Sequence, residues 1–195
     1  MSVNVLSLQG EWLIVHSRMG RDDSMDCLEV KLLQNPPPLP KQGNSHQYDR
    51  AVEQARRFTE QSPQSTVPQA LLSRIYWIQG RVSEAIAERR KIATMVQSAQ
   101  MMRDQDEVSA AFNKGGIRAA ALKAGQLMER DGDFAWASYA YGIGQDASKV
   151  VESWEQALRA GDGTVAYSIK TSPEFDFMHG DPRYQEMLRR LDLMQ

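Results

Sequence analysis

Apolar residues recur at helical spacing through most of the chain after residue 47. Leu71, Leu72, Ile75 and Tyr76 form one apolar stripe that ends at Gly80. A second stripe follows at Ala85, Ile86, Ile92, Ala93 and Val96. Two helices separated by a glycine turn are therefore predicted. Thr66, with Gln69 three residues later, predicts a capping box at the start of the first helix.

The second stripe belongs to a pattern with a fixed period. Ala51, Ala85 and Ala119 recur at intervals of 34 residues, each in the same helical context. In the unit of Ala85, Ser73 supplies the small residue of the first helix, and Pro63 closes the unit of Ala51. A small residue repeated at this interval indicates stacked helix pairs, which form a solenoid and do not close around one core.

The pattern resembles the tetratricopeptide (TPR) repeat, in which each unit is a helix, a turn and a second helix. The resemblance implies an all-α fold over residues 47–195, an α-α superhelix built as a right-handed solenoid of antiparallel helix pairs. A C-terminal capping helix is expected to close it. Residues 1–46 do not share the repeat and are expected to form an irregular or weakly structured segment with a proline-rich linker.

The later units follow the pattern unevenly. The third carries Asp106 and Glu107 where a leucine and a small residue should pack, yet it still indicates two helices around Gly115-Gly116. The fourth unit matches the pattern again. The residues at its pattern positions are Phe134, Ala137, Ser138, Tyr141, Val150, Trp154 and Ala157. Three repeats plus one half are predicted.

The N-terminal segment favours two short strands joined by a turn at Gln9-Gly10-Glu11. Their apolar residues are Val3, Val5, Leu6 and Leu8, then Trp12, Leu13, Ile14 and Val15. Such a hairpin is marginal in water without a third strand. Residues 27–33 could extend it or form a short helix, and the sequence does not choose between them.

Four prolines in residues 35–40 break regular structure. They favour a linker over a ligand for a proline-recognising domain, because no basic anchor lies beside them. The linker occupies the place of a first helix, so the helix from about Gln47 to Gln61 starts without its upstream partner. Residues 1–33, another chain such as a second copy, or a missing part of a longer chain would have to cover it.

The C-terminal segment has its own signature. Ser172-Pro173 and Asp181-Pro182 each place a capping side chain before a proline that suits a first helical turn. Apolar residues then share one helix face at Tyr184, Met187, Leu188 and Leu191. A terminal helix that caps the solenoid is predicted.

This segment resembles the end of the TPR region in many bacterial multidomain proteins, which carries a P-x-F-D-x-L/M step and a D-P-R-[FY]-x-x-L-L-R-R closure. The matching residues are Pro173, Phe175, Asp176, Met178, Asp181, Pro182, Arg183, Tyr184, Leu188, Arg189 and Arg190. In that group the repeats follow a winged-helix, protein kinase or cyclase domain. Residues 1–46 are too few for a winged helix and carry no kinase motif.

Composition excludes several classes of protein. A net charge of −2, with basic residues interleaved with acidic ones, argues against direct nucleic-acid binding. No apolar run reaches the length of a membrane span and no signal peptide is present, so a cytoplasmic location and no membrane contact are expected. Cys27 is the single cysteine, which permits no internal disulfide.

Catalytic chemistry is not indicated. His16, His46 and His179 are scattered, and no metalloprotease, nucleophile-elbow or phosphate-loop motif occurs. Asp22-Asp23 and Asp131-Gly132-Asp133 lack the length and terminal glutamate of a calcium loop. We therefore expect no enzyme activity, no catalytic residues, no bound metal and no cofactor.

Function in such a solenoid belongs to the inner face, which the first helices form. Repeat positions 2, 5, 9 and 12 give the candidate partner-binding residues Arg74, Trp77, Met101, Asp104, Val108, Ala135 and Tyr139. Arginine, tryptophan and tyrosine are the types that anchor interfaces, although in helices the aromatic ones also serve as core.

The sequence thus predicts a non-catalytic scaffold that binds a protein or peptide segment on a concave face. The alternative is a truncated sensor or regulatory module of a bacterial transcription regulator or signalling protein. The identity of the partner, the biological process and the oligomeric state do not follow from the sequence.

Overall fold

The computed structural model describes residues 3–9, 12–17, 26–30 and 45–193, with side chains from Tyr48 onward except those of Arg50 and Tyr167. The expected proline linker and the acidic pair Asp22-Asp23 lie outside the described residues. So do the side chains of His16, Cys27 and His46.

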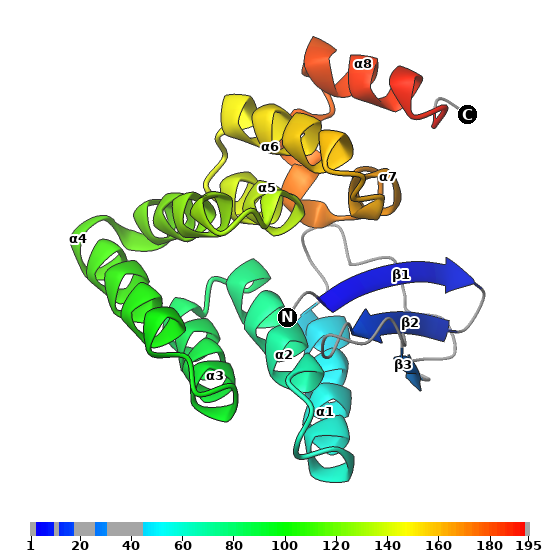
Figure 1. Cartoon of the computed structure of the whole chain (residues 1–195). Coiled ribbons are helices and arrows are strands. Elements are labelled where there is room, and N and C mark those ends of the chain that lie inside the picture. The colour runs from blue at the N-terminus through cyan, green and yellow to red at the C-terminus, as the bar shows by residue number, and fades with distance from the viewer. Residues whose placement is uncertain (1–2, 10–11, 18–25, 31–44, 194–195) are drawn as a thin grey trace.

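An antiparallel sheet of three strands precedes the helices (Figure 1). The strands are β1 (Val3–Gln9), β2 (Trp12–Ser17) and β3 (Asp26–Val30), paired in that order. The expected strand pair is present, with Gln9 opposite Trp12 on either side of the expected turn. Residues 26–30 form a third strand, which decides between the strand and the helix considered for this stretch, and β1 contacts α7 (Thr164–Ser168).

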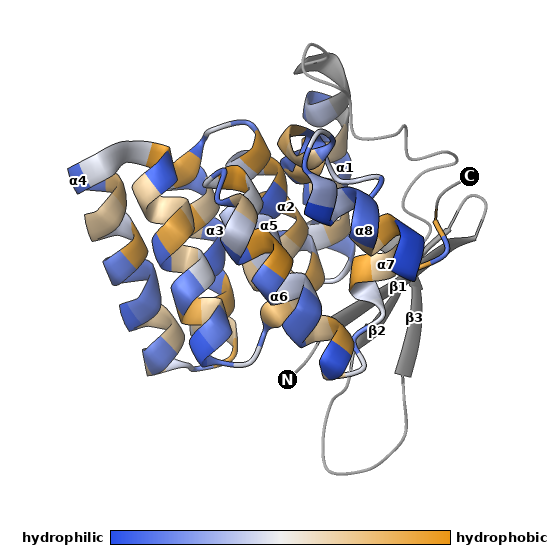
Figure 2. Cartoon of the chain, turned by 90° about the horizontal axis from the view of Figure 1, so that it is seen from above, coloured by the Kyte–Doolittle hydropathy of each residue, from blue (hydrophilic) through white to orange (hydrophobic). Residues whose placement is uncertain are grey.

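From Ser45 to Arg190 the described chain is helical, and the helices pack against their neighbours in sequence order. They are α1 (Ser45–Gln61), α2 (Val67–Ile78), α3 (Val82–Met95), α4 (Ala99–Arg130), α5 (Phe134–Ile143), α6 (Ala147–Arg159), α7, the 3-10 helix η1 (Pro173–Met178) and α8 (Pro182–Arg190). Figure 2 shows that apolar and hydrophilic residues alternate along the turns of these helices.

The contact between α2 and α3 occurs at the small residues of the repeat. Ala85 is fully buried, and the Ser73 hydroxyl donates to the Ala85 carbonyl at 3.0 Å. Gly80 makes the turn between these helices with φ +74°, a backbone conformation that residues with a Cβ rarely adopt. The predicted helix-turn-helix unit is confirmed here.

The glycine pair breaks α4 into two arms. Gly115 and Gly116 have non-helical backbone angles, and φ at Gly116 is 68°. The arms fold back on one another, because Lys123 pairs with Glu107 at 3.4 Å and Arg130 pairs with Asp104 at 2.9 Å. The predicted turn at this point is confirmed.

One side of α1 is buried against the next helix. Val52 and Ala55 are buried in a cluster with Leu72, Ile75 and Tyr76. Leu72, Ile75 and Tyr76 all belong to α2, so α1 packs against the helix that follows it. This contact is with the downstream helix, and the expectation that α1 lacks an upstream partner stays a prediction.

The largest core lies in the C-terminal half. Trp154 of α6 is fully buried, with Phe175 edge-on at 4.9 Å between ring centroids and Tyr184 at 6.1 Å. Tyr184, Met187 and Leu188 of α8 are buried in the same cluster, which confirms the predicted apolar face of the terminal helix. Seven of the ten residues of α5 are buried, so this helix is core on nearly all sides.

The predicted caps have mixed outcomes. The Asp181 carboxylate accepts from the Arg183 backbone amide at 2.9 Å, as predicted. The capping box at Thr66 is wrong: this residue has helical backbone angles, so its hydroxyl makes no cap hydrogen bond. The Ser65 hydroxyl accepts from the Val67 amide instead, at 3.3 Å. Ser172 also makes no cap bond.

Candidate partner-binding surface

The predicted inner-face residues lie on α2, the first arm of α4, and α5, and they differ in burial. Val108, Ala135, Asp104 and Tyr139 are only 2%, 3%, 6% and 7% exposed. Arg74, Trp77 and Met101 are half-buried. In this structure the four buried residues offer a partner little surface, whereas the other three keep some.

Arg74 is held by the C-terminal segment of its own chain. Its guanidinium donates through Nε to Glu174 Oε1 at 3.0 Å, and through Nη2 to Glu174 Oε2 at 3.4 Å and to the Ser172 hydroxyl at 3.1 Å. The Glu174 side chain is 1% exposed and that of Arg74 is 25% exposed. Two bonds from one planar group to one carboxylate fix both charge and direction.

Tyr139 joins the same group of side chains. The Arg74 guanidinium lies 4.3 Å from the centroid of the Tyr139 ring, within the range of a cation–π contact. On the same segment, Phe175 stacks on Tyr139 with centroids 5.3 Å apart and an interplanar angle of 22°. A carboxylate and an aromatic ring at consecutive positions of η1 therefore meet a cation and an aromatic ring on the helices.

The backbone of η1 approaches α5 closely at Gly142. A Cβ atom added to this glycine would lie 2.7 Å from the Glu174 carbonyl oxygen, closer than real Cβ contacts come. Gly142 is at repeat position 12 and Tyr139 at position 9, both inner-face positions in the sequence pattern. These two predicted inner-face positions of α5 are thus covered by η1, drawn in orange in Figure 1.

The electrostatics reflect this enclosure. Burial would lower the pKa of Arg74, but the Glu174 carboxylate raises it, and the pKa lies above its ordinary value. Burial, reinforced by the charge of Glu174, raises the pKa of the Tyr48 hydroxyl on α1. The charge of Glu174 therefore affects a residue of α1 as well as its ion-pair partner on α2.

Asp104 belongs to a second, separate group. It accepts from Arg130 at 2.9 Å and from Gln100 at 2.8 Å. Burial raises the pKa of Asp104, whereas the hydrogen bonds from Arg130 and Gln100 lower it, and the net pKa is below its usual value. The role of Asp104 in the structure is to join the two arms of α4.

Trp77 and Val108 also come together, as core. Val108 is buried with Val82, Ile86 and Ala120, and Trp77 packs on this cluster as well as on the cluster between α1 and α2. Trp77 therefore links two neighbouring packing units and keeps only part of its ring surface free.

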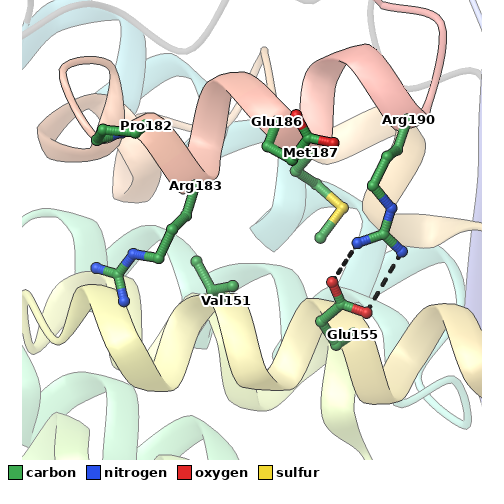
Figure 3. Close-up of a pocket in the computed structure, with 7 residues that line it drawn as sticks. All are labelled: Val151, Glu155, Pro182, Arg183, Glu186, Met187 and Arg190. Atoms are coloured by element: carbon green, nitrogen blue, oxygen red, sulfur yellow. Dashed lines mark hydrogen bonds and ion pairs between the residues drawn. The ribbon is translucent and has the colours of Figure 1, made fainter.

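A surface pocket of about 270 Å³ lies elsewhere, between α6 and α8 (Figure 3). Val151 and Met187 provide apolar walls, while Arg190 pairs with Glu155 across it. Arg183 is held by Asp181 and by the Ser148 hydroxyl at 3.1 Å. Because these charges already have partners, we treat the pocket as the seam where the terminal helix docks.

The sequence did not indicate that Ser172, Glu174 and Phe175 contact two of the predicted inner-face residues, Arg74 and Tyr139. One signal was available: Glu174 lies next to Phe175 in a segment that also contains Phe177 and Met178, so its burial would require a cation. That cation lies 100 residues away on α2, at a distance that no periodicity reveals.

Comparison of the chain with protein-family models, curated proteins and solved structures finds no match. Within the described residues, no group of three or more His, Cys, Asp and Glu side chains could hold a metal ion. None of the helices that the structure describes is long and apolar enough to cross a membrane.

Proposed function

We propose that this chain is a non-catalytic tetratricopeptide-like scaffold that binds a protein or peptide segment on its inner face. The helix pairs would form a right-handed superhelix, with the first helix of each pair lining the concave side. A cytoplasmic location stays a prediction.

One observation carries the proposal: two residues predicted for the inner face already contact a short stretch of polypeptide. Arg74 and Tyr139 come from the same position of two different repeats, and both contact η1. Arginine and tyrosine are among the residue types that most often anchor protein interfaces. A face with this chemistry is suited to recognising a segment of another chain.

The partner would use the inner-face residues that keep exposed surface. Of the predicted set these are Arg74, Trp77 and Met101, the last an adaptable apolar side chain. A single segment that contacts few residues binds modestly, since ordering it costs entropy. Useful affinity would come from several contacts made at once along successive repeats.

The test is a selection from a random dodecapeptide library on the purified full-length chain, followed by affinity measurements for the enriched peptides. Trp77→Phe and Met101→Ala should weaken the selected peptides by about tenfold, the effect of losing one good interface contact. Lys114→Ala and Arg118→Ala, at exposed positions beside the glycine turn of α4, serve as matched controls.

Helicity by circular dichroism must be equal in all four variants. Failure to enrich any peptide, or equal weakening by the two control variants, would overturn the inner-face assignment.

A further inference from the structure

We propose that the inner face between α2 and α5 selects a partner segment in which an acidic residue is followed directly by an aromatic one, and that η1 is a built-in competitor for that segment. This inference rests on the proposed function and specifies its ligand.

The first step concerns charge. In the described structure the ion pair of Arg74 is with Glu174, and the carboxylate accepts two of the three guanidinium hydrogen bonds. Arg74 also donates to the Ser172 hydroxyl, two residues before the acid. A neutral segment would leave the half-buried guanidinium without an anion, which is costly. The face therefore discriminates in favour of a carboxylate.

The second step concerns the residue after the acid. Phe175 is fully buried, stacked on Tyr139 and edge-on to Trp154. Aromatic pairs in these geometries contribute beyond the area they bury. An aliphatic residue at this place would lose both ring contacts, so the site prefers an aromatic side chain.

The third step concerns how η1 is held. Its backbone hydrogen bonds at both ends are local: the Phe175 amide donates to the Ser172 carbonyl, and the His179 amide donates to the Asp176 carbonyl. Side chains make the polar contacts with α2, namely those of Arg74 with Ser172 and Glu174. A foreign segment with the same side chains can replace these contacts without any rearrangement of the backbone bonds of α2 and α5.

The fourth step is the competition itself. A tethered segment acts at an effective concentration of about millimolar or more, so a free peptide binds the intact chain weakly. Weakening the tethered copy should therefore strengthen binding in trans. The gain should disappear when the arginine is removed as well.

The experiment uses a fluorescein-labelled peptide of residues 170–181 and fluorescence anisotropy with the full-length chain. We expect Glu174→Ala to bind the peptide at least about tenfold more tightly than the wild type, because the peptide then supplies the missing carboxylate. The double variant Arg74→Ala/Glu174→Ala should bind the peptide no more tightly than the wild type. A peptide with glutamine in place of its glutamate should bind at least about tenfold more weakly to Glu174→Ala.

Equal affinity of the two peptides for Glu174→Ala, or no gain over the wild type, would overturn the inference. Glu174→Gln, which keeps the size of the side chain, replaces Glu174→Ala if the latter loses its helicity. Light scattering is run in parallel, and dimers of Glu174→Ala that the peptide cannot dissociate would also overturn it, since a second copy would then be the occupant.

The two proposals fail in different ways. Library peptides that depend on Trp77 and Met101 but lack an acidic–aromatic pair would overturn this inference and leave the scaffold proposal standing. If the chain enriches no library peptide and does not bind the peptide of residues 170–181, both proposals are overturned.

Discussion

Arg74 of α2 and Glu174 of η1 are separated by 100 residues and joined by two hydrogen bonds, the shorter of 3.0 Å. The carboxylate is 1% exposed, so it depends on this guanidinium for its neutralisation. The contact connects a helix near the start of the repeats with the segment that follows the last complete helix pair.

A double-mutant cycle measures this link. Arg74→Ala alone should lower the free energy of unfolding by about 3 kcal/mol, because a buried carboxylate is left unpaired. Glu174→Ala and the double variant complete the cycle, and we expect a coupling energy of about 1–3 kcal/mol. The measurement is urea unfolding followed by circular dichroism at neutral pH.

The matched control is the pair Glu53–Arg57 on α1, whose side chains are 62% and 69% exposed. Its coupling energy should be about 0.5 kcal/mol or less, as is usual for exposed helix pairs. Similar coupling in the two cycles would contradict the structural role given to Arg74.

Substitution of Gly142 tests the close approach of η1 to α5. Gly142→Ala should lower the free energy of unfolding by about 1–3 kcal/mol, since the new Cβ would press on the Glu174 carbonyl. Gly180→Ala is the control, because nothing lies within 4 Å of its Cβ position and its φ is outside the left-handed region. Equal stability of the two variants would show that η1 is not seated as described.

Asp104 should make stability depend on pH. Its folded-state pKa is lowered, so the stabilisation by its contacts with Arg130 and Gln100 is present above the unfolded pKa and is lost as pH falls through the folded one. Asp104→Asn should therefore be less stable than the wild type at pH 7, and the difference should shrink below about pH 4. Denaturant unfolding at pH 7 and pH 3 checks this, and a constant difference would refute it.

The two N-cap residues Asp181 and Thr66 should respond differently to alanine. Asp181→Ala removes a hydrogen bond to the Arg183 amide and should cost about 1 kcal/mol of stability. Thr66→Ala removes no cap hydrogen bond and should change stability by less than about 0.5 kcal/mol. Thermal melts of the two variants make the comparison, and a larger loss at Thr66 would mean that its hydroxyl caps α2 after all.

The sequence was most informative where contacts are local. The interval between Ala51, Ala85 and Ala119 predicted the helix pair that contains Ala85. The hydrogen bond from Ser73 to Ala85 joins the two small residues that the pattern named in that pair. Glycines with positive φ, such as Gly80 and Gly116, marked the turns because few other residues adopt that backbone. In both cases the cause and its structural effect are close together along the chain.

The burial of the predicted inner-face residues could not be predicted from the pattern. Counting repeat positions placed Val108, Ala135 and Tyr139 on it, and the structure buries all three. Periodicity predicts the direction in which a side chain leaves its helix. It does not predict whether a segment distant in the sequence covers that side chain. The position of η1 depends on Arg74 and Gly142 together, and no local pattern joins them.

The return of η1 to α2 affects how this array loses its structure. Helical arrays in which each unit touches only the next can fray from an end, one unit at a time. Here the bond between Arg74 and Glu174 makes the end of the array depend on its beginning. Loss of α2 or of η1 breaks contacts of the other, so these two parts should melt in a single cooperative transition.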